Sequence, residues 1–225
     1  IKADIPRSQC GKIQFSALLC HGNTQAIMQK KARLFTLMSL LLLIAGCHQP
    51  PQWNGLDVSG ILPDLEFELI DSDGDEVNAA AFHGKSTLLF FGFTNCPGVC
   101  PATLGQLKVA LGELGKEADQ VQVLLVSVDP ERDTPQAMKD YTERFGPWLH
   151  GITGPRERLK ALNNAFKVDF MAQQPDKDGN YEVAHSGRVF AFDASGQCRV
   201  LLGDTADTAS VVADLKQLIS ESAKL

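Results

Sequence analysis

An apolar segment that runs into a pair of cysteines constrains this chain more than any other feature of its sequence. Residues 86–93 form a continuous apolar run of strand length, which is typical of a central strand buried on both faces. The turn that follows carries Cys96 and Cys100, and leucines then recur at helical spacing over residues 104–114. Pro101 suits the first helical position, because its missing N–H would be unpaired there. We therefore expect Cys100 at a helix N-terminus, where free N–H groups and the positive end of the helix dipole lower a thiol pKa.

The N-terminal part of the chain has the pattern of a bacterial secretory signal. A basic stretch precedes the apolar residues 34–45, which are too few to span a bilayer, and the small residues before Cys47 resemble a lipoprotein cleavage site. We interpret residues 28–46 as the signal peptide and Cys47 as the lipidated first residue of the mature protein. Residues 1–27 are interpreted as upstream sequence that is not part of the protein. An ordinary signal peptide with a chance cysteine is the alternative.

Charge and cysteine usage narrow the possible function classes. Residues 1–46 hold six of the 21 Lys and Arg and one of the 27 Asp and Glu, so the chain from Cys47 has 15 basic and 26 acidic residues and a formal net charge of −11. This acidity argues against nucleic acid as a partner. Beyond the anchor, the cysteines are Cys96, Cys100 and Cys198. In an oxidising compartment, a close pair plus one leftover thiol indicates a redox or metal pair, with Cys198 as an inert core thiol.

The remaining sequence alternates strand and helix patterns. Residues 47–60 are expected to form a tether, residues 61–225 one domain, and residues 65–69 an edge strand that turns back at residues 71–75 to make an N-terminal hairpin. Later predicted elements are a strand at 121–128, a helix at 135–145, a short segment at 148–153, a helix at 155–166, a short strand at 168–172, a hairpin at 189–192 and 198–202, and a helix at 207–218. This order predicts an α/β fold with a parallel sheet and covering helices.

The spacing of the cysteine pair is compatible with redox chemistry and with metal binding. Cys96 and Cys100 are spaced C-x₃-C, one residue wider than thioredoxin-type redox turns. Two thiolates and one imidazole make a soft site that suits copper, above all Cu(I). His185, just before the last hairpin, could supply the imidazole. A lone histidine before a strand is, however, more often a surface or core residue than a metal ligand.

Three motifs in a fixed order carry a resemblance to a known family. They read FGFTNCPGVCP at residues 91–101, VDPERDTP at residues 128–135 and VAHS at residues 183–186. Together they resemble the Sco/SenC family of copper-binding proteins over residues 61–218. The resemblance implies a thioredoxin-like central sheet with covering helices, to which the N-terminal hairpin is added.

The resemblance also implies roles for individual residues. Cys96, Cys100 and His185 would be the copper ligands, and Asp129 would lie near the site and assist the metal or the thiols. Gly98, and Ala184 beside the histidine, stand where the family usually has aspartate. Because neither is a ligand, we expect copper binding to persist, with altered affinity, Cu(II) preference or partner contact.

Two function classes follow from this pattern. The leading hypothesis is a metallochaperone that carries copper, as Cu(I) with Cu(II) as the alternative, to an extracytoplasmic cuproprotein; by the resemblance this is cytochrome c oxidase, through its subunit II. The alternative is an enzyme, a thiol–disulfide oxidoreductase whose pair Cys96 and Cys100 reduces the cysteines of a cuproprotein and is restored by a thioredoxin-like reductant. A peroxiredoxin-like peroxidase is a weaker third candidate, because Thr94 lies two residues before Cys96 instead of three.

The expected location is the bacterial cell envelope. Lipidation at Cys47 would anchor the domain in a membrane and leave it facing the periplasm or the exterior. His48 in place of aspartate after the lipidated cysteine favours the outer membrane, by resemblance to known lipoproteins.

Overall fold

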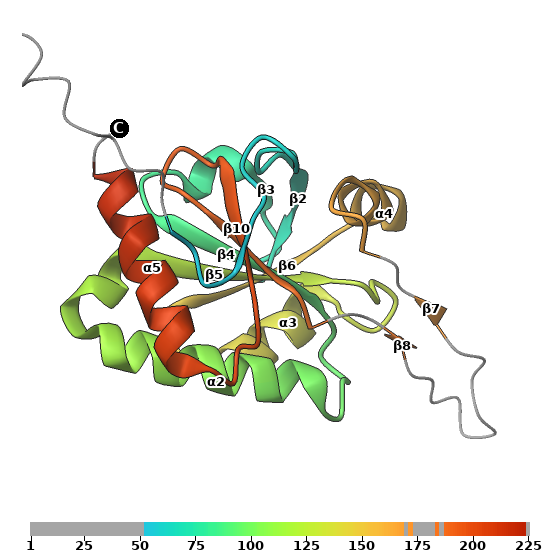
Figure 1. The fold of residues 1–225 in the computed structure, drawn as a ribbon. Helices are drawn as coiled ribbons and strands as arrows, with labels where there is room; N and C mark the ends of the chain where they lie inside the picture. Colours follow the sequence, from blue (N-terminus) through green and yellow to red (C-terminus); the bar gives the residue numbers. More distant parts are fainter. Residues whose placement is uncertain (1–51, 169–170, 173–182, 185–186, 224–225) are drawn as a thin grey trace, which may run out of the picture. The chain divides into compact units, whose positions relative to one another are not determined.

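The computed structural model describes residues 52–168, 171–172, 183–184 and 187–223, and a mixed sheet forms the centre of this part of the chain (Figure 1). Its strands, in spatial order, are β1 (Leu56–Asp57), β10 (Cys198–Leu202), β9 (Val189–Phe192), β4 (Ser86–Gly92), β5 (Val121–Ser127), β6 (Leu149–Thr153), β2 (Glu68–Asp71) and β3 (Glu76–Asn78). The strands β4, β5 and β6 are parallel, whereas β9 and β2 pair antiparallel to β4 and β6. A separate antiparallel pair consists of β7 (Met171–Ala172) and β8 (Val183–Ala184).

Helices cover both faces of the sheet. They are η1 (Ala79–Phe82), α2 (Val99–Leu114), η2 (Gly115–Gln120), α3 (Pro135–Thr142), α4 (Arg156–Ala165) and α5 (Thr208–Ser222). Figure 1 shows α2 and α5 side by side, and the two helices pack against each other. The helix α3 lies on the same face as α2, because Gly151 of β6 and Gly92 of β4 are on one side of the sheet and approach Met138 and Cys100 respectively. None of the helices in the described residues is long and apolar enough to cross a membrane.

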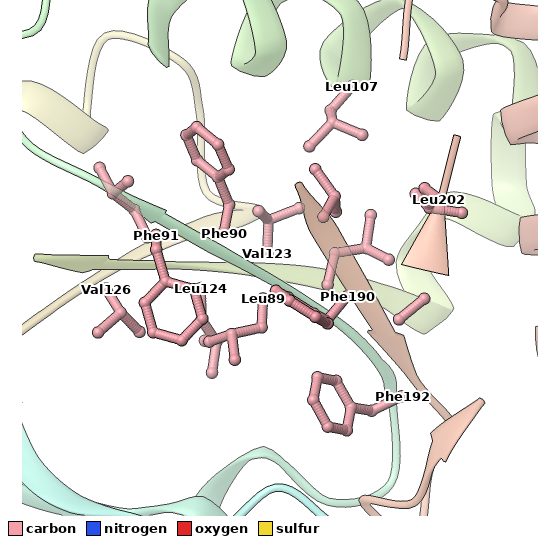
Figure 2. Packing of buried hydrophobic residues seen from close by; sticks show 14 of the residues in the cluster. Leu89, Phe90, Phe91, Leu107, Val123, Leu124, Val126, Phe190, Phe192 and Leu202 are labelled. Carbon is pink, nitrogen blue, oxygen red and sulfur yellow. The ribbon is translucent and has the colours of Figure 1, made fainter. Parts of the chain in front are cut away.

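The core is built on the alternation of side chains along β4. Phe90 points to the side of the sheet where Leu107 of α2 lies, and Phe91 points to the opposite side (Figure 2). On that side, Phe166 at the end of α4 lies 6.1 Å from Phe91 and 5.2 Å from Phe190, measured between ring centroids. All four rings are at most 2% exposed. The cysteine turn therefore follows a strand that is packed on both faces, as the sequence predicts.

The predicted α/β class, with a central sheet, covering helices and an N-terminal hairpin, is confirmed. The sheet is mixed and not purely parallel as predicted, because the two hairpins join β4 and β6 through antiparallel pairs. The other differences concern the bounds of elements. The first hairpin strand begins at Glu68 instead of Leu65, because the Leu65 N–H is hydrogen-bonded to Gly196 in a turn, outside the ladder. The helix predicted to continue to residue 145 ends at Thr142 and is followed by a turn with Gly146 at a φ of 129°. Within the strand predicted at 168–172, the described residues Met171 and Ala172 form β7, which pairs with β8.

Part of the expected tether belongs to the domain. The Asp214 carboxylate of α5 accepts hydrogen bonds from the backbone N–H groups of Asn54, at 2.7 Å, and Gly55, at 2.8 Å. The Asn54 side chain donates a third bond to the same carboxylate, at 3.0 Å. Directly after these residues, β1 pairs with β10. Residues 54–57 are therefore part of the domain, and they are held at a buried carboxylate that the sequence pattern does not mark.

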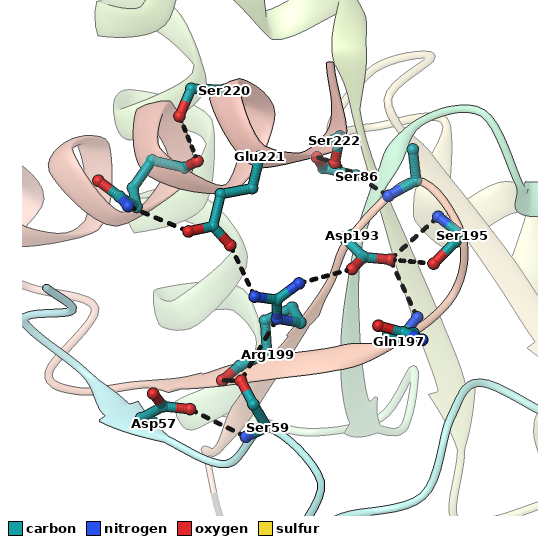
Figure 3. A network of polar contacts seen from close by, with 12 residues as sticks. Asp57, Ser59, Ser86, Asp193, Ser195, Gln197, Arg199, Ser220, Glu221 and Ser222 are labelled. Atoms are coloured by element: carbon teal, nitrogen blue, oxygen red, sulfur yellow. Dashed lines mark hydrogen bonds and ion pairs between the residues drawn. The ribbon is translucent and has the colours of Figure 1, made fainter. Parts of the chain in front are cut away.

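A second polar network fixes the last hairpin to the end of α5 (Figure 3). Arg199 donates to Asp193 at 3.0 Å and to Glu221 at 2.8 Å, and the Asp193 carboxylate also accepts bonds from Ser195 and Gln197. Asp193 is 1% exposed, so its charge requires these partners. The network stabilises the hairpin beside the start of β4, where Phe192 pairs with Thr87, whereas the cysteine turn follows the end of that strand.

Candidate metal centre

The cysteine turn lies between the end of β4 and the start of α2. Gly98 is the residue before the helix and Val99 is the first helical residue, so Cys100 is the second and Pro101 the third. The prediction that Pro101 occupies the first position is therefore wrong by two residues. The Cys100 N–H donates to the sulfur of Cys96 at 3.3 Å. It is thus the Cys96 sulfur that receives a free N–H from the helix N-terminus.

Cys100 is fully buried, and its burial changes the expected chemistry. A Cβ added at Gly92 would lie 2.8 Å from the Cys100 sulfur, so only glycine leaves room for that sulfur beside β4. Burial raises the pKa of the Cys100 thiol, a hydrogen bond from the Phe93 backbone opposes this rise, and the nearby Cys96 and Asp133 add to it. The expectation of a lowered pKa at Cys100 is therefore wrong for the thiol without metal. Loss of hydration outweighs the effect of the helix end here.

The third thiol lies away from this turn. Cys198 is in β10 and is 2% exposed, and burial raises its pKa to about 12. These properties agree with the prediction of an inert core thiol, since the thiolate is the reactive form.

Two acidic residues follow β5, and they have different surroundings. Asp129, the residue predicted to lie near the site, forms an ion pair with Arg132, and its backbone N–H donates to Ser127 at 3.0 Å. Asp133 has no exposed surface and accepts bonds from the Thr94 N–H at 3.1 Å, the Thr94 hydroxyl at 2.6 Å and the Ser127 hydroxyl at 2.6 Å. Burial raises the pKa of Asp133, and these hydrogen bonds oppose the rise. Asp133 therefore bonds to Thr94 in the segment that leads to Cys96.

Sequence reasoning missed Asp133 as a site residue, although it lies inside the motif at residues 128–135. The signal that could have identified it is its position directly before Thr134 and Pro135, the N-cap and first residue of α3. A carboxylate there is close to the C-terminal ends of neighbouring parallel strands, where functional groups of such sheets gather.

Tyr141 of α3 is a second residue that the sequence did not indicate. It is 7% exposed, and within the described part of the chain its hydroxyl has no hydrogen-bond partner. Burial raises the pKa of this hydroxyl, and the nearby Cys100 and Cys96 raise it further. Tyr141 is therefore a buried phenol in the electrostatic neighbourhood of both cysteines.

The predicted histidine ligand, His185, lies outside the described residues, as does the predicted lipidation site Cys47. The described chain resumes at Gly187, where an added Cβ would lie 3.1 Å from a methyl group of Val99, the first residue of α2. From there β9 runs alongside β4, with Val189 opposite Phe90. Among the residues that the structure describes, no three His, Cys, Asp or Glu side chains are grouped to hold a metal. Cys96 and Cys100 are the two predicted ligands that it brings together.

Comparisons with known proteins agree with the motifs. A family model described as SCO1/SenC matches residues 62–220. The chain is similar to the structure of Bradyrhizobium japonicum ScoI with copper bound, at 35% identity and a TM-score of 0.61, over 69% of this chain and 98% of that one. It is also similar to apo Sco1 from Thermus thermophilus, at 35% identity and a TM-score of 0.64, over 77% and 99% of the two chains. These matches confirm the expected thioredoxin-like fold.

A curated relative gives a shorter match. An SCO2-like protein of Rickettsia conorii is 35% identical over 133 residues, which are 59% of this chain and 65% of the relative. The chain thus spans just under two thirds of that relative's length.

Proposed function

The chain belongs to the SCO1/SenC family, and from this premise we propose that it binds one copper ion through Cys96, Cys100 and His185. The observation that carries the proposal is the pair of sulfurs in one turn, with the Cys96 sulfur 3.3 Å from the Cys100 N–H. Thiolates are soft ligands, and two of them with an imidazole match the preference of Cu(I), with Cu(II) as the alternative form. Among similar proteins, ScoI of Bradyrhizobium japonicum has copper bound.

The position of Gly187 supports His185 as the third ligand. Gly187 packs against Val99, one residue before Cys100. Two residues of extended chain span at most about 7 Å, so His185 is within reach of the start of α2. The proposed role of Asp129 near the metal is indirect: its carboxylate holds Arg132, whose guanidinium lies over the Phe93 ring.

Copper in this proposal is cargo. Ligand exchange between thiolates would pass it to an extracytoplasmic cuproprotein, by the family resemblance cytochrome c oxidase through its subunit II. Gly98 and Ala184 remove negative charge from the proposed site, and the affinity for the cation is expected to differ from that of relatives with aspartate there.

Metal analysis after dialysis against a competing chelator tests the copper site. The purified protein should retain one copper per chain, and Cys96→Ser, Cys100→Ser and His185→Ala should lose it. Cys198→Ser is the matched control, because Cys198 is a buried thiol outside the turn, and it should retain copper. Equal copper in His185→Ala and wild type would remove His185 from the site, and equal copper in Cys96→Ser would overturn the site as a whole.

A specific observation also favours the second candidate, a thiol–disulfide oxidoreductase. Cys96 is 7% exposed and accepts a helix N–H, whereas Cys100 is fully buried. This asymmetry suits Cys96 as the attacking thiolate. Its sulfur would bond to one sulfur of a partner disulfide and release the other as a thiol. Cys100 would then attack the Cys96 sulfur of the mixed disulfide. This releases the partner as a dithiol, reduced by two electrons, and leaves a Cys96–Cys100 disulfide. A thioredoxin-like reductant would restore the Cys96 and Cys100 thiols.

His185 separates the two functions. A dithiol reductase does not require an imidazole ligand. If the protein is a thiol–disulfide oxidoreductase, His185→Ala should therefore lose its copper but still reduce a model disulfide. Loss of copper delivery to an apo-cuproprotein in His185→Ala, with disulfide reduction unchanged, would assign delivery to the metal site.

We propose a cell-envelope location with a lipid anchor at Cys47. The anchor would hold the domain at the membrane in high salt and release it in detergent, because several acyl chains bind far more firmly than one. Fractionation of wild type and Cys47→Ala tests this, and wild-type protein in the soluble fraction would contradict it. Wild-type protein in the inner membrane would contradict the outer-membrane sorting suggested by His48, and nothing else.

A further inference from the structure

The segment after β5 contacts the residues that lead into the cysteine turn. Asp133 accepts two hydrogen bonds from Thr94, through the backbone N–H at 3.1 Å and the hydroxyl at 2.6 Å. Arg132 lies beside it, with its guanidinium carbon 5.7 Å from the centre of the Phe93 ring. Residues 93 and 94 are therefore held from one side by two consecutive residues of another loop.

Asp133 is itself tied to the ends of the two neighbouring strands. Its second carboxylate oxygen accepts a bond from the Ser127 hydroxyl at 2.6 Å, at the end of β5. Its backbone oxygen accepts a bond from the Thr153 hydroxyl at 2.7 Å, at the end of β6. Asp133 has no exposed surface, so its carboxylate depends on these bonds and not on water. Asp133 therefore fixes Thr94 relative to the ends of β5 and β6.

The segment that Asp133 holds contacts both cysteines. The Cys96 N–H donates to the Phe93 oxygen at 3.2 Å, and the Phe93 backbone is hydrogen-bonded to the Cys100 sulfur. A shift of residues 93 and 94 would consequently move Cys96 relative to the Cys100 N–H that its sulfur accepts. Outer groups that orient metal ligands commonly affect metal affinity in this way.

We propose that Asp133 is a positioning residue for the cysteine pair, which sets the distance between the two sulfurs by holding Thr94. This inference rests on the proposed copper site and deepens it. The carboxylate acts through hydrogen bonds and does not bind the metal. Asp129 pairs instead with Arg132 through its carboxylate.

Three variants test the proposal by competition for Cu(I) against a chelator, at a temperature where circular dichroism shows each variant folded. Asp133→Ala and Thr94→Val should each weaken copper binding by about 10- to 100-fold, the usual loss when an outer group that orients a ligand is removed. Asp133→Asn should recover most of this loss, because an amide oxygen can accept both bonds from Thr94. A loss in Asp133→Asn as large as in Asp133→Ala would overturn positioning by hydrogen bonds.

Asp214→Ala is the matched control. Asp214 is also a buried carboxylate that accepts backbone N–H bonds, but its partners are Asn54 and Gly55, outside the cysteine turn. The Asp214→Ala variant should have a lower free energy of unfolding, and its folded form should bind copper with the wild-type affinity. If Asp133→Ala behaves in the same way as Asp214→Ala, Asp133 has a general structural role and the proposal is wrong.

A readout without copper separates failure of this inference from failure of the proposed function. In Thr94→Val and Asp133→Ala, alkylation of Cys96 should become faster relative to that of Cys198, and hydrogen exchange at the backbone N–H of residue 94 should become faster. Wild-type protein that binds no copper would refute the proposed function, while these rates would still test Asp133. Wild-type protein that binds copper, with unchanged affinity and rates in both variants, would refute Asp133 as a positioning residue and leave the copper site intact.

Discussion

Replacing Gly92 with alanine should damage the cysteine site by introducing a single methyl group. The added Cβ would lie 2.8 Å from the Cys100 sulfur and 3.0 Å from a methyl carbon of Leu125. Both neighbours have no exposed surface. Neither can therefore move outward into solvent, and the sulfur or the strand must shift.

The expected magnitude combines two opposing effects. Overpacking a well-packed core costs about 1–3 kcal/mol. Alanine in place of glycine recovers about 0.4–1 kcal/mol by restricting the unfolded chain. The net loss in the free energy of unfolding should be about 1–2 kcal/mol, which corresponds to a decrease in Tm of roughly 2–8 °C for a chain of this size. Copper retention should fall as well, because the displaced atom is a proposed ligand.

Urea unfolding of Gly92→Ala and Gly105→Ala, together with copper analysis of both, checks this reasoning. Gly105 lies inside α2 with no atom within 4 Å of an added Cβ. Gly105→Ala should therefore stabilise the protein by about 0.5–1 kcal/mol, since glycine is unfavourable in a helix. If Gly92→Ala is as stable as wild type and retains its copper, the close approach of Cys100 to β4 does not constrain the site.

Three further predictions concern the packing of Phe166, the reactivity of the Cys198 thiol and the protonation of His150. Phe166→Ala should lower the free energy of unfolding by about 3–5 kcal/mol in urea titrations, because its ring packs against three buried phenylalanines. Cys198, with a pKa raised to about 12, should resist iodoacetamide at pH 8 in the folded protein and react in urea; rapid modification without urea would contradict its burial. Burial lowers the pKa of His150, so the unfolded state binds its proton more readily. Stability should consequently fall as the pH decreases through about 6.5, and His150→Gln should reduce this dependence in unfolding curves measured across that range.

Local sequence patterns are sufficient to predict the α/β class and the position of the cysteine turn. The apolar run at residues 86–93 predicts a strand buried on both faces, and β4 is such a strand. The spacing of apolar residues likewise predicts the helix after the turn, the last hairpin and the closing helix. Hydrophobic periods of two and 3.6 residues can be recognised from neighbouring residues alone, because a strand or helix buries one face whichever segment packs against it.

The burial of each cysteine, and which sulfur accepts an N–H from the helix N-terminus, depend on the packing of the whole domain. The pattern correctly places Cys100 at a helix N-terminus, but the structure brings the Cys100 N–H to the Cys96 sulfur and buries Cys100 behind Gly92. The tertiary structure also places Asp133, 39 residues away in the chain, where it holds Thr94. Burial and such contacts depend on how distant segments pack, and the loss of hydration that shifts a pKa follows from that packing and not from neighbours in the sequence.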